Sequence, residues 1–175
     1  MKPTVMVGVP IFLMVMATTV LAKNIDQTKT AGPYRIELEV LPPETFYSAK
    51  QVAAGESKMG MLILGGAEPV QPDAPSHPDH HLVVHVFQKT TNKALTNANV
   101  HLTVQPLDSK GQPAGNVMEV PVVRMQMINT AGMAGMGSAE TTHYGNNVSL
   151  PPGDYRVEAV ANGHRARFAI KVAAG

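Results

Sequence analysis

Short segments in which apolar and polar residues alternate recur along most of the chain, and this period of two is typical of half-buried β-strands. No window of about twelve residues keeps the 3.6-residue period of an amphipathic helix. Pro and Gly recur between the alternating segments, as expected of turns. The pattern therefore predicts an all-β fold, an immunoglobulin-like antiparallel β-sandwich of about seven strands. The predicted strands are 34–40, 59–64, 81–88, 98–105, 118–128, 155–159 and 166–172.

Two of these segments carry further signals. Asn162-Gly163 separates the last two strands and is the residue pair that favours a type I′ turn, so a C-terminal β-hairpin is expected. Pro121 cannot donate a backbone hydrogen bond, which places the 118–128 strand at a sheet edge or a bulge. Two segments are predicted to be loops: 65–78, which is rich in Pro and Gly, and 129–142, which is rich in Gly and Met.

The first 22 residues have the order of a secretory signal peptide: Lys2, then an apolar run, then small residues before a cleavage site after Ala22. The run of about 16 apolar residues is shorter than the ~20 of a spanning helix, although an uncleaved membrane anchor is the alternative. Residues 1–22 are therefore predicted to be removed. Residues 23–175 are expected to form one exported domain without stable membrane insertion.

Composition excludes several classes of function. The formal net charge is only +1, so binding of nucleic acid through phosphate neutralisation is not expected. The chain has no Cys, which excludes disulfides, thiolate nucleophiles and iron–sulfur clusters. It has 11 Met and 7 His, however, and both side chains can bind metal ions without a thiol.

The histidines cluster around the start of one predicted strand, at His77, His80, His81 and His85. His81 and His85 share one strand face, opposite the apolar face that should form the core. Their Cα atoms are expected about 13 Å apart at ~3.3 Å per residue, too far to bind one ion together. We therefore expect His81 to act with ligands from elsewhere. The alternative is that the cluster is merely polar surface.

Methionines are paired on two predicted strands. Met59 and Met61 share a strand face, as do Met125 and Met127, while Met133 and Met136 lie in the second Gly-rich loop. Thioethers suit Cu(I), and imidazole suits copper, iron and zinc. Together these Met and His side chains could therefore bind copper in an oxidising compartment. The alternative is that the paired methionines fill gaps in the core. Another candidate ligand, His143, directly precedes Tyr-Gly-Asn-Asn where the second loop meets a strand.

The segment from Met125-Gln126-Met127 to His143-Tyr144-Gly145-Asn146-Asn147 resembles the Met-x-Met and His-Tyr-Gly-x-Asn motifs of the periplasmic P19/Tp34-type iron-transport proteins. These are immunoglobulin-like, dimeric, copper-binding proteins. The resemblance implies a periplasmic location, copper or iron as the bound ion, a homodimer and an inner-membrane permease as partner. It also implies that His81, His143 and Glu44 are metal ligands.

The sequence therefore predicts a protein that captures copper or iron and passes it to a membrane transport partner. An enzyme is not expected, because the chain has no Gly-x-Ser-x-Gly elbow, His-Glu-x-x-His helix or phosphate-binding loop. The alternative function is an exported immunoglobulin-like module that binds another envelope protein and has no metal role.

Overall fold

The structure is a computed structural model that describes residues 25–56, 59–73, 77–128 and 142–173. The predicted signal peptide lies outside the described residues, as do Met133 and Met136. Within them the protein is a β-sandwich of two sheets, which confirms the predicted fold class. The described chain forms eleven strands rather than about seven, together with one short helix. No helix in these ranges has the length and apolar character needed to span a bilayer.

The larger sheet has seven strands in the order β1-β2-β5-β9-β8-β4-β3, and the smaller has four in the order β11-β10-β6-β7. All pairings are antiparallel except that of β3 with β4. The strands of the larger sheet are β1 (Ile25–Ala31), β2 (Tyr34–Leu41), β3 (Phe46–Tyr47), β4 (Gly60–Leu64), β5 (His80–Gln88), β8 (Val123–Ile128) and β9 (Thr142–Val148). Those of the smaller sheet are β6 (Val100–Leu107), β7 (Met118–Val120), β10 (Gly153–Ala161) and β11 (His164–Val172).

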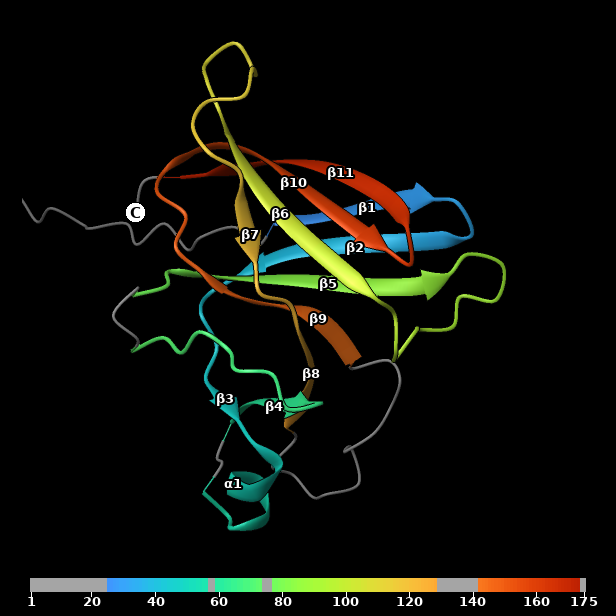
Figure 1. The fold of residues 1–175 in the computed structure, drawn as a ribbon, viewed down its shortest axis with the longest axis vertical. Helices are drawn as coiled ribbons and strands as arrows, with labels where there is room; N and C mark the ends of the chain where they lie inside the picture. The colour runs from blue at the N-terminus through green and yellow to red at the C-terminus, as the bar shows by residue number, and fades with distance from the viewer. Residues whose placement is uncertain (1–24, 57–58, 74–76, 129–141, 174–175) are drawn as a thin grey trace, which may run out of the picture.

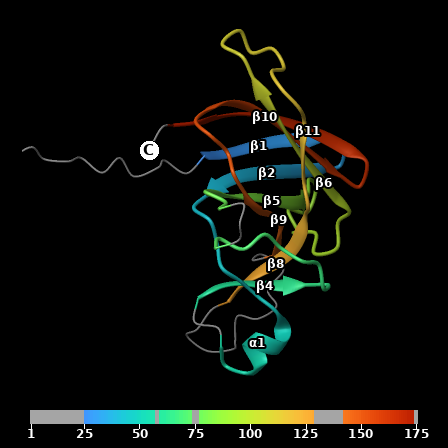
Figure 2. The same ribbon diagram turned by 60° about the vertical axis from the view of Figure 1, so that its left-hand side comes forward.

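The smaller sheet covers only part of the larger one. Figures 1 and 2 show β6, β10 and β11 packed over the end formed by β1, β2 and β5, whereas β3 and β4 lie at the far end. The helix α1 (Ala49–Ala53) lies at that same far end, and its first turn is closed by a capping box between Ser48 and Gln51. The end of the larger sheet that contains β3 and β4 therefore lies beyond the smaller sheet.

The main core lies between the two sheets and follows the alternation in the sequence. On β5 the side chains of Leu82, Val84 and Val86 are buried in this core, as predicted. They pack in the same cluster as Val157 and Phe168 from the smaller sheet. The predicted C-terminal hairpin is present too, with both turn residues, Asn162 and Gly163, at positive φ.

The segment predicted as one strand, 118–128, is two strands in different sheets. β7 pairs with β6 in the smaller sheet and β8 pairs with β4 and β9 in the larger one. The change occurs at Pro121, which has no N–H for a continuous ladder. Its carbonyl instead accepts a hydrogen bond from the side chain of Asn146 at 2.7 Å. The break places Met125 on a different sheet from Met118.

The alternation missed β1 and β3. β1 has the sequence Ile-Asp-Gln-Thr-Lys-Thr-Ala, which is too polar to show a buried face, and it forms because it pairs along its whole length with β2. β3 has only two residues, too few for any periodic signal, and is set by its parallel pairing with β4. Both elements depend on a partner strand rather than on their own pattern.

Candidate metal centre

The candidate ligands meet on the outer face of the larger sheet, the face turned away from the smaller sheet. β5 and β9 are neighbours in antiparallel register, with His81 opposite Asn147 and Val83 opposite Gly145. Directly paired residues point to the same side of a sheet and alternate along each strand. His81 and His143 therefore share the outer face, opposite the side occupied by Leu82.

The imidazole of His81 is fully buried, with 0% of the residue exposed. The ring of Phe46 contacts it edge-on, with centroids 5.6 Å apart. Among the described residues neither ring nitrogen has a hydrogen-bond partner. Burial lowers the pKa of His81 to about 4, although Asn147 and the backbone of Asn146 favour the protonated ring more weakly. Neither of these two groups forms a hydrogen bond with a ring nitrogen.

His143 lies between two other histidines. Its ring centroid is 5.8 Å from that of His81 and 5.6 Å from that of His85. His143 is buried as well. The structure thus brings His81 and His143 side by side from strands that are far apart in sequence. His81 and His85 can belong to one cluster although they are four positions apart, because His143 on β9 lies next to both.

His85 was not among the predicted ligands, and the structure adds it to the cluster. It is half-buried and its Nε2 lies 3.7 Å from a carboxylate oxygen of Glu39 on β2. Burial lowers its pKa, and the negative charge of Glu39 opposes that shift. The sequence did place His81 and His85 on one strand face. The missing information was the register of β9, which sets His143 between them.

Met125 is the thioether that the sheet places beside the histidines. It pairs directly with His143 across β8 and β9, and it is fully buried. Met61 on β4 is also buried, and the two methionines form a small apolar cluster with Phe46 and Val123. This cluster lies on the outer face, separate from the main core. Met61 and Met125 therefore fill a small core, as the packing alternative expected, and Met125 also adjoins His143.

The other two methionines are exposed. Met127 lies two residues after Met125, near the end of β8 and on the same strand face. It is 56% exposed, although it pairs with the buried Met61. Met59 is 76% exposed and lies outside β4. The strand predicted from residue 59 begins one residue later, and Gly60 has φ +138°, so the regular alternation that would pair Met59 with Met61 does not extend to Met59.

Glu44 is linked to the site through its backbone. Its N–H donates to the side-chain oxygen of Asn147 at 3.0 Å, and its carbonyl accepts from the Asn147 amide at 2.7 Å. Partial burial raises the pKa of the Glu44 carboxyl. Across the described part of the chain, no three His, Cys, Asp or Glu side chains are arranged to hold one metal ion. The structure therefore does not gather Glu44, His81 and His143 into a three-ligand group.

Amide side chains that sequence reasoning missed hold two loops against this face. Asn147 also donates to the carbonyl of Val70 at 2.9 Å, and the N–H of Val70 donates to Asn146. Gln71 in turn bonds both the N–H and the carbonyl of Phe46. The bonds to Gln71 hold Phe46 in place, and Phe46 in turn covers the ring of His81. The Asn-Asn pair was visible in the sequence, but its partners were not.

The remaining histidines do not join the cluster. The Nδ1 atom of His80 is hydrogen-bonded to the carboxylate of Asp79 at 2.7 Å. The ring of His164 contacts that of Tyr34 in an edge-to-face arrangement. His77 and His101 are exposed. For these four residues the polar-surface interpretation describes the structure better than a ligand role does.

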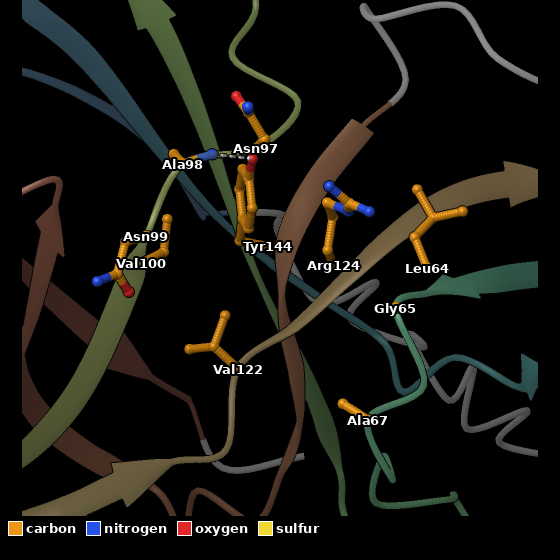
Figure 3. A pocket seen from close by; sticks show the side chains of 10 residues that line it. All are labelled: Leu64, Gly65, Ala67, Asn97, Ala98, Asn99, Val100, Val122, Arg124 and Tyr144. Carbon is orange, nitrogen blue, oxygen red and sulfur yellow. Dashed lines mark hydrogen bonds between the residues drawn. The ribbon is translucent and has the colours of Figure 1, made fainter.

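A separate cavity of about 340 Å³ lies on the opposite side of β8 and β9 (Figure 3). Arg124 and Tyr144 line it, and each directly neighbours a candidate ligand in the chain, so they point to the other face. The Tyr144 hydroxyl accepts the N–H of Ala98 at 2.7 Å and donates to the carbonyl of Leu95 at 2.8 Å. None of the candidate metal ligands lines this cavity.

The outer face thus combines two adjacent buried imidazoles with a buried thioether, all of them soft or borderline donors. Comparisons with models of protein families, with curated protein sequences and with solved structures found no match.

Proposed function

We propose that this protein binds copper as Cu(I) through His81, His143 and Met125, and that it carries the ion in the periplasm to a membrane transport partner. The copper ion is cargo in this proposal rather than a cofactor for turnover. The observation that carries the proposal is the buried, unpartnered imidazole of His81 beside that of His143.

A buried polar group without a hydrogen bond costs about 1–3 kcal/mol, so its retention needs a reason. Coordination of a metal ion supplies one, because an imidazole nitrogen that lacks a hydrogen bond has its lone pair available. The lowered pKa of His81 keeps that ring neutral at pH 7, and only a neutral imidazole can coordinate. Formation of the site at neutral pH therefore needs no proton to leave His81.

The choice of copper follows from the donor set. Met125 pairs with His143, and a thioether favours Cu(I) over harder ions. Iron, the other predicted ion, is harder and needs oxygen or nitrogen donors in greater number. Binding a monovalent ion through neutral donors also introduces only one positive charge into the buried site. The chemistry of the outer face therefore favours copper.

The test is a titration of chelator-treated protein with Cu(I) under anaerobic conditions, in competition with a chromogenic Cu(I) chelator. We expect the wild type to bind a single ion per chain. His143→Ala and the more conservative His143→Asn should weaken binding by at least roughly tenfold, since even loss of groups that only orient ligands costs 10–100-fold. Circular dichroism of each variant establishes that it has folded.

The matched control is His101→Ala, because His101 is an exposed histidine on β6 of the other sheet. It should bind Cu(I) as the wild type does. Unchanged affinity in both folded His143 variants would refute the copper site. The alternative function, an exported interaction module without a metal role, would then describe the protein better. Parallel titrations with Cu(II) and Fe(II) separate the candidate ions.

A further inference from the structure

Three methionines, one exposed and two buried, lie on the outer face of β4 and β8 beside the strand that carries His143. Met127 is 56% exposed, whereas Met61 and Met125 are buried. Met127 pairs directly with Met61, and Met125 pairs directly with His143. Met127, Met61 and Met125 therefore form a row of methionine positions on one sheet face, which runs from an exposed residue to the candidate ligand.

The spacing between successive donors is short. Met125 and Met127 are two residues apart on one strand, so they share a face and their Cα atoms lie about 7 Å apart. Directly paired residues such as Met127 and Met61 have Cβ atoms about 5 Å apart. A methionine side chain has three rotatable bonds and can change its conformation within a packed cluster. Met61 and Met125 belong to one packed cluster, so each step along the row is within reach of two flexible thioethers.

The surroundings of the row suit a soft monovalent ion. Met61 and Met125 pack with Phe46 and Val123, so an ion moving here is surrounded by apolar side chains and neutral sulfur. On the other side of the site, Phe46 lies against the His81 ring and is held by both hydrogen bonds to Gln71. Direct approach to His81 from that side requires these contacts to break. The methionine row offers a route that leaves them in place.

We propose that Met127, Met61 and Met125 form an entry path for Cu(I), with Met127 as the first ligand to accept the ion from a donor. This inference rests on the proposed copper-binding function and adds its route. The ion moves by ligand exchange: a bond to the next sulfur forms before the bond to the previous one breaks. No electron or proton is transferred. The ion is Cu(I) along the whole path and is still Cu(I) when it is bound by His143 and His81.

A path residue differs from a site ligand in what it changes. Its loss slows entry and exit equally and leaves the affinity unchanged, whereas loss of a ligand lowers the affinity. Met127→Leu removes the sulfur at an exposed position. Because the side chain is not tightly packed, the variant should fold as the wild type does. It therefore tests the path without disturbing the cluster around Met125.

The experiment measures Cu(I) loading of apo protein by stopped flow from a Cu(I)–chelate donor, alongside equilibrium affinity. We expect Met127→Leu to load and release at least roughly fivefold more slowly with an affinity within about twofold of the wild type, a purely kinetic change. Met125→Leu should instead lower the affinity. The control is Met118→Leu, a half-buried methionine on β7 of the other sheet, which should match the wild type.

Wild-type loading and release rates in Met127→Leu would refute the entry path while leaving the copper site intact. A loss of affinity as large as the loss of rate would also refute it, because Met127 would then be a ligand. Failure of the wild type to bind Cu(I), or unchanged affinity in the folded His143 variants, would instead refute the proposed function.

Discussion

Gly145 on β9 leaves no room for a side chain, because a Cβ atom there would collide with the backbone carbonyl oxygen of Leu82 on β5. The two strands approach so closely at this point that only glycine fits. His143 and His81 lie on these same two strands, one on each. The glycine of the His-Tyr-Gly motif therefore allows the pairing that brings the two imidazoles together.

Gly145→Ala should destabilise the protein by roughly 2–3 kcal/mol, because the obstructing atom belongs to a backbone that cannot move aside. Urea denaturation of the variant and the wild type measures the difference. Gly153→Ala is the control, since a Cβ there would meet its nearest atom at 3.6 Å, an ordinary contact. Equal stability of the Gly145 variant and the wild type would show that the strands can separate at this point.

Asn147→Ala should lower the free energy of unfolding by roughly 2–4 kcal/mol. The change removes three hydrogen bonds to the backbone of Glu44 and Val70, each worth about 1 kcal/mol, and leaves partly buried groups without partners. Hydrogen exchange of the Glu44 amide should accelerate at the same time. Asn99→Ala provides the comparison, because the Asn99 side chain is exposed. An unaffected Glu44 amide would contradict the role of Asn147 in holding this loop.

Tyr144→Phe should cost about 1–2 kcal/mol, because the hydroxyl is both an acceptor from Ala98 and a donor to Leu95. Denaturant midpoints of the two proteins give the value. Tyr47→Phe, at a half-exposed position, should change stability little. The Tyr144 variant should retain wild-type Cu(I) affinity, since the hydroxyl lies on the opposite face from His143; a weakened affinity would link the two faces.

The apo protein should lose stability as the pH falls from about 6.5 to about 4. In this window an ordinary imidazole in the unfolded chain binds a proton, whereas His81, with its pKa of about 4, does not bind one when folded. The unfolded state therefore gains protons first, and stability is complete above pH 6.5. The loss reaches about 3 kcal/mol at pH 4, from 1.36 kcal/mol for each pH unit.

Urea denaturation of chelator-treated protein between pH 4 and 7 measures this slope. His81→Gln should reduce it without removing it, because burial lowers the pKa of His85 in the same direction. An NMR titration of the His81 ring provides the direct measurement. A midpoint near 6.5 would contradict its buried, unpartnered state.

Part of the candidate site could be predicted from the sequence. The alternation of β5 identified Leu82, Val84 and Val86 as the core face and placed His81 and His85 together on the other. The motif around His143 and the Met125 pair identified two further members of the cluster. The sequence did not predict the burial of His81, because Phe46 and the amide side chains that hold it come from distant segments.

By itself the sequence determined local properties of the chain: where strands such as β5, β10 and β11 alternate, which of their faces is apolar, and where Asn162-Gly163 turns the final hairpin. These depend on neighbouring residues, so they can be derived without the fold. Only the tertiary structure decided that β9 lies beside β5, that the chain changes sheet at Pro121, and that Met127 is exposed while Met125 is buried. These features depend on pairing between segments far apart in the chain, and hydrophobic alternation does not specify the partner or the register of a strand.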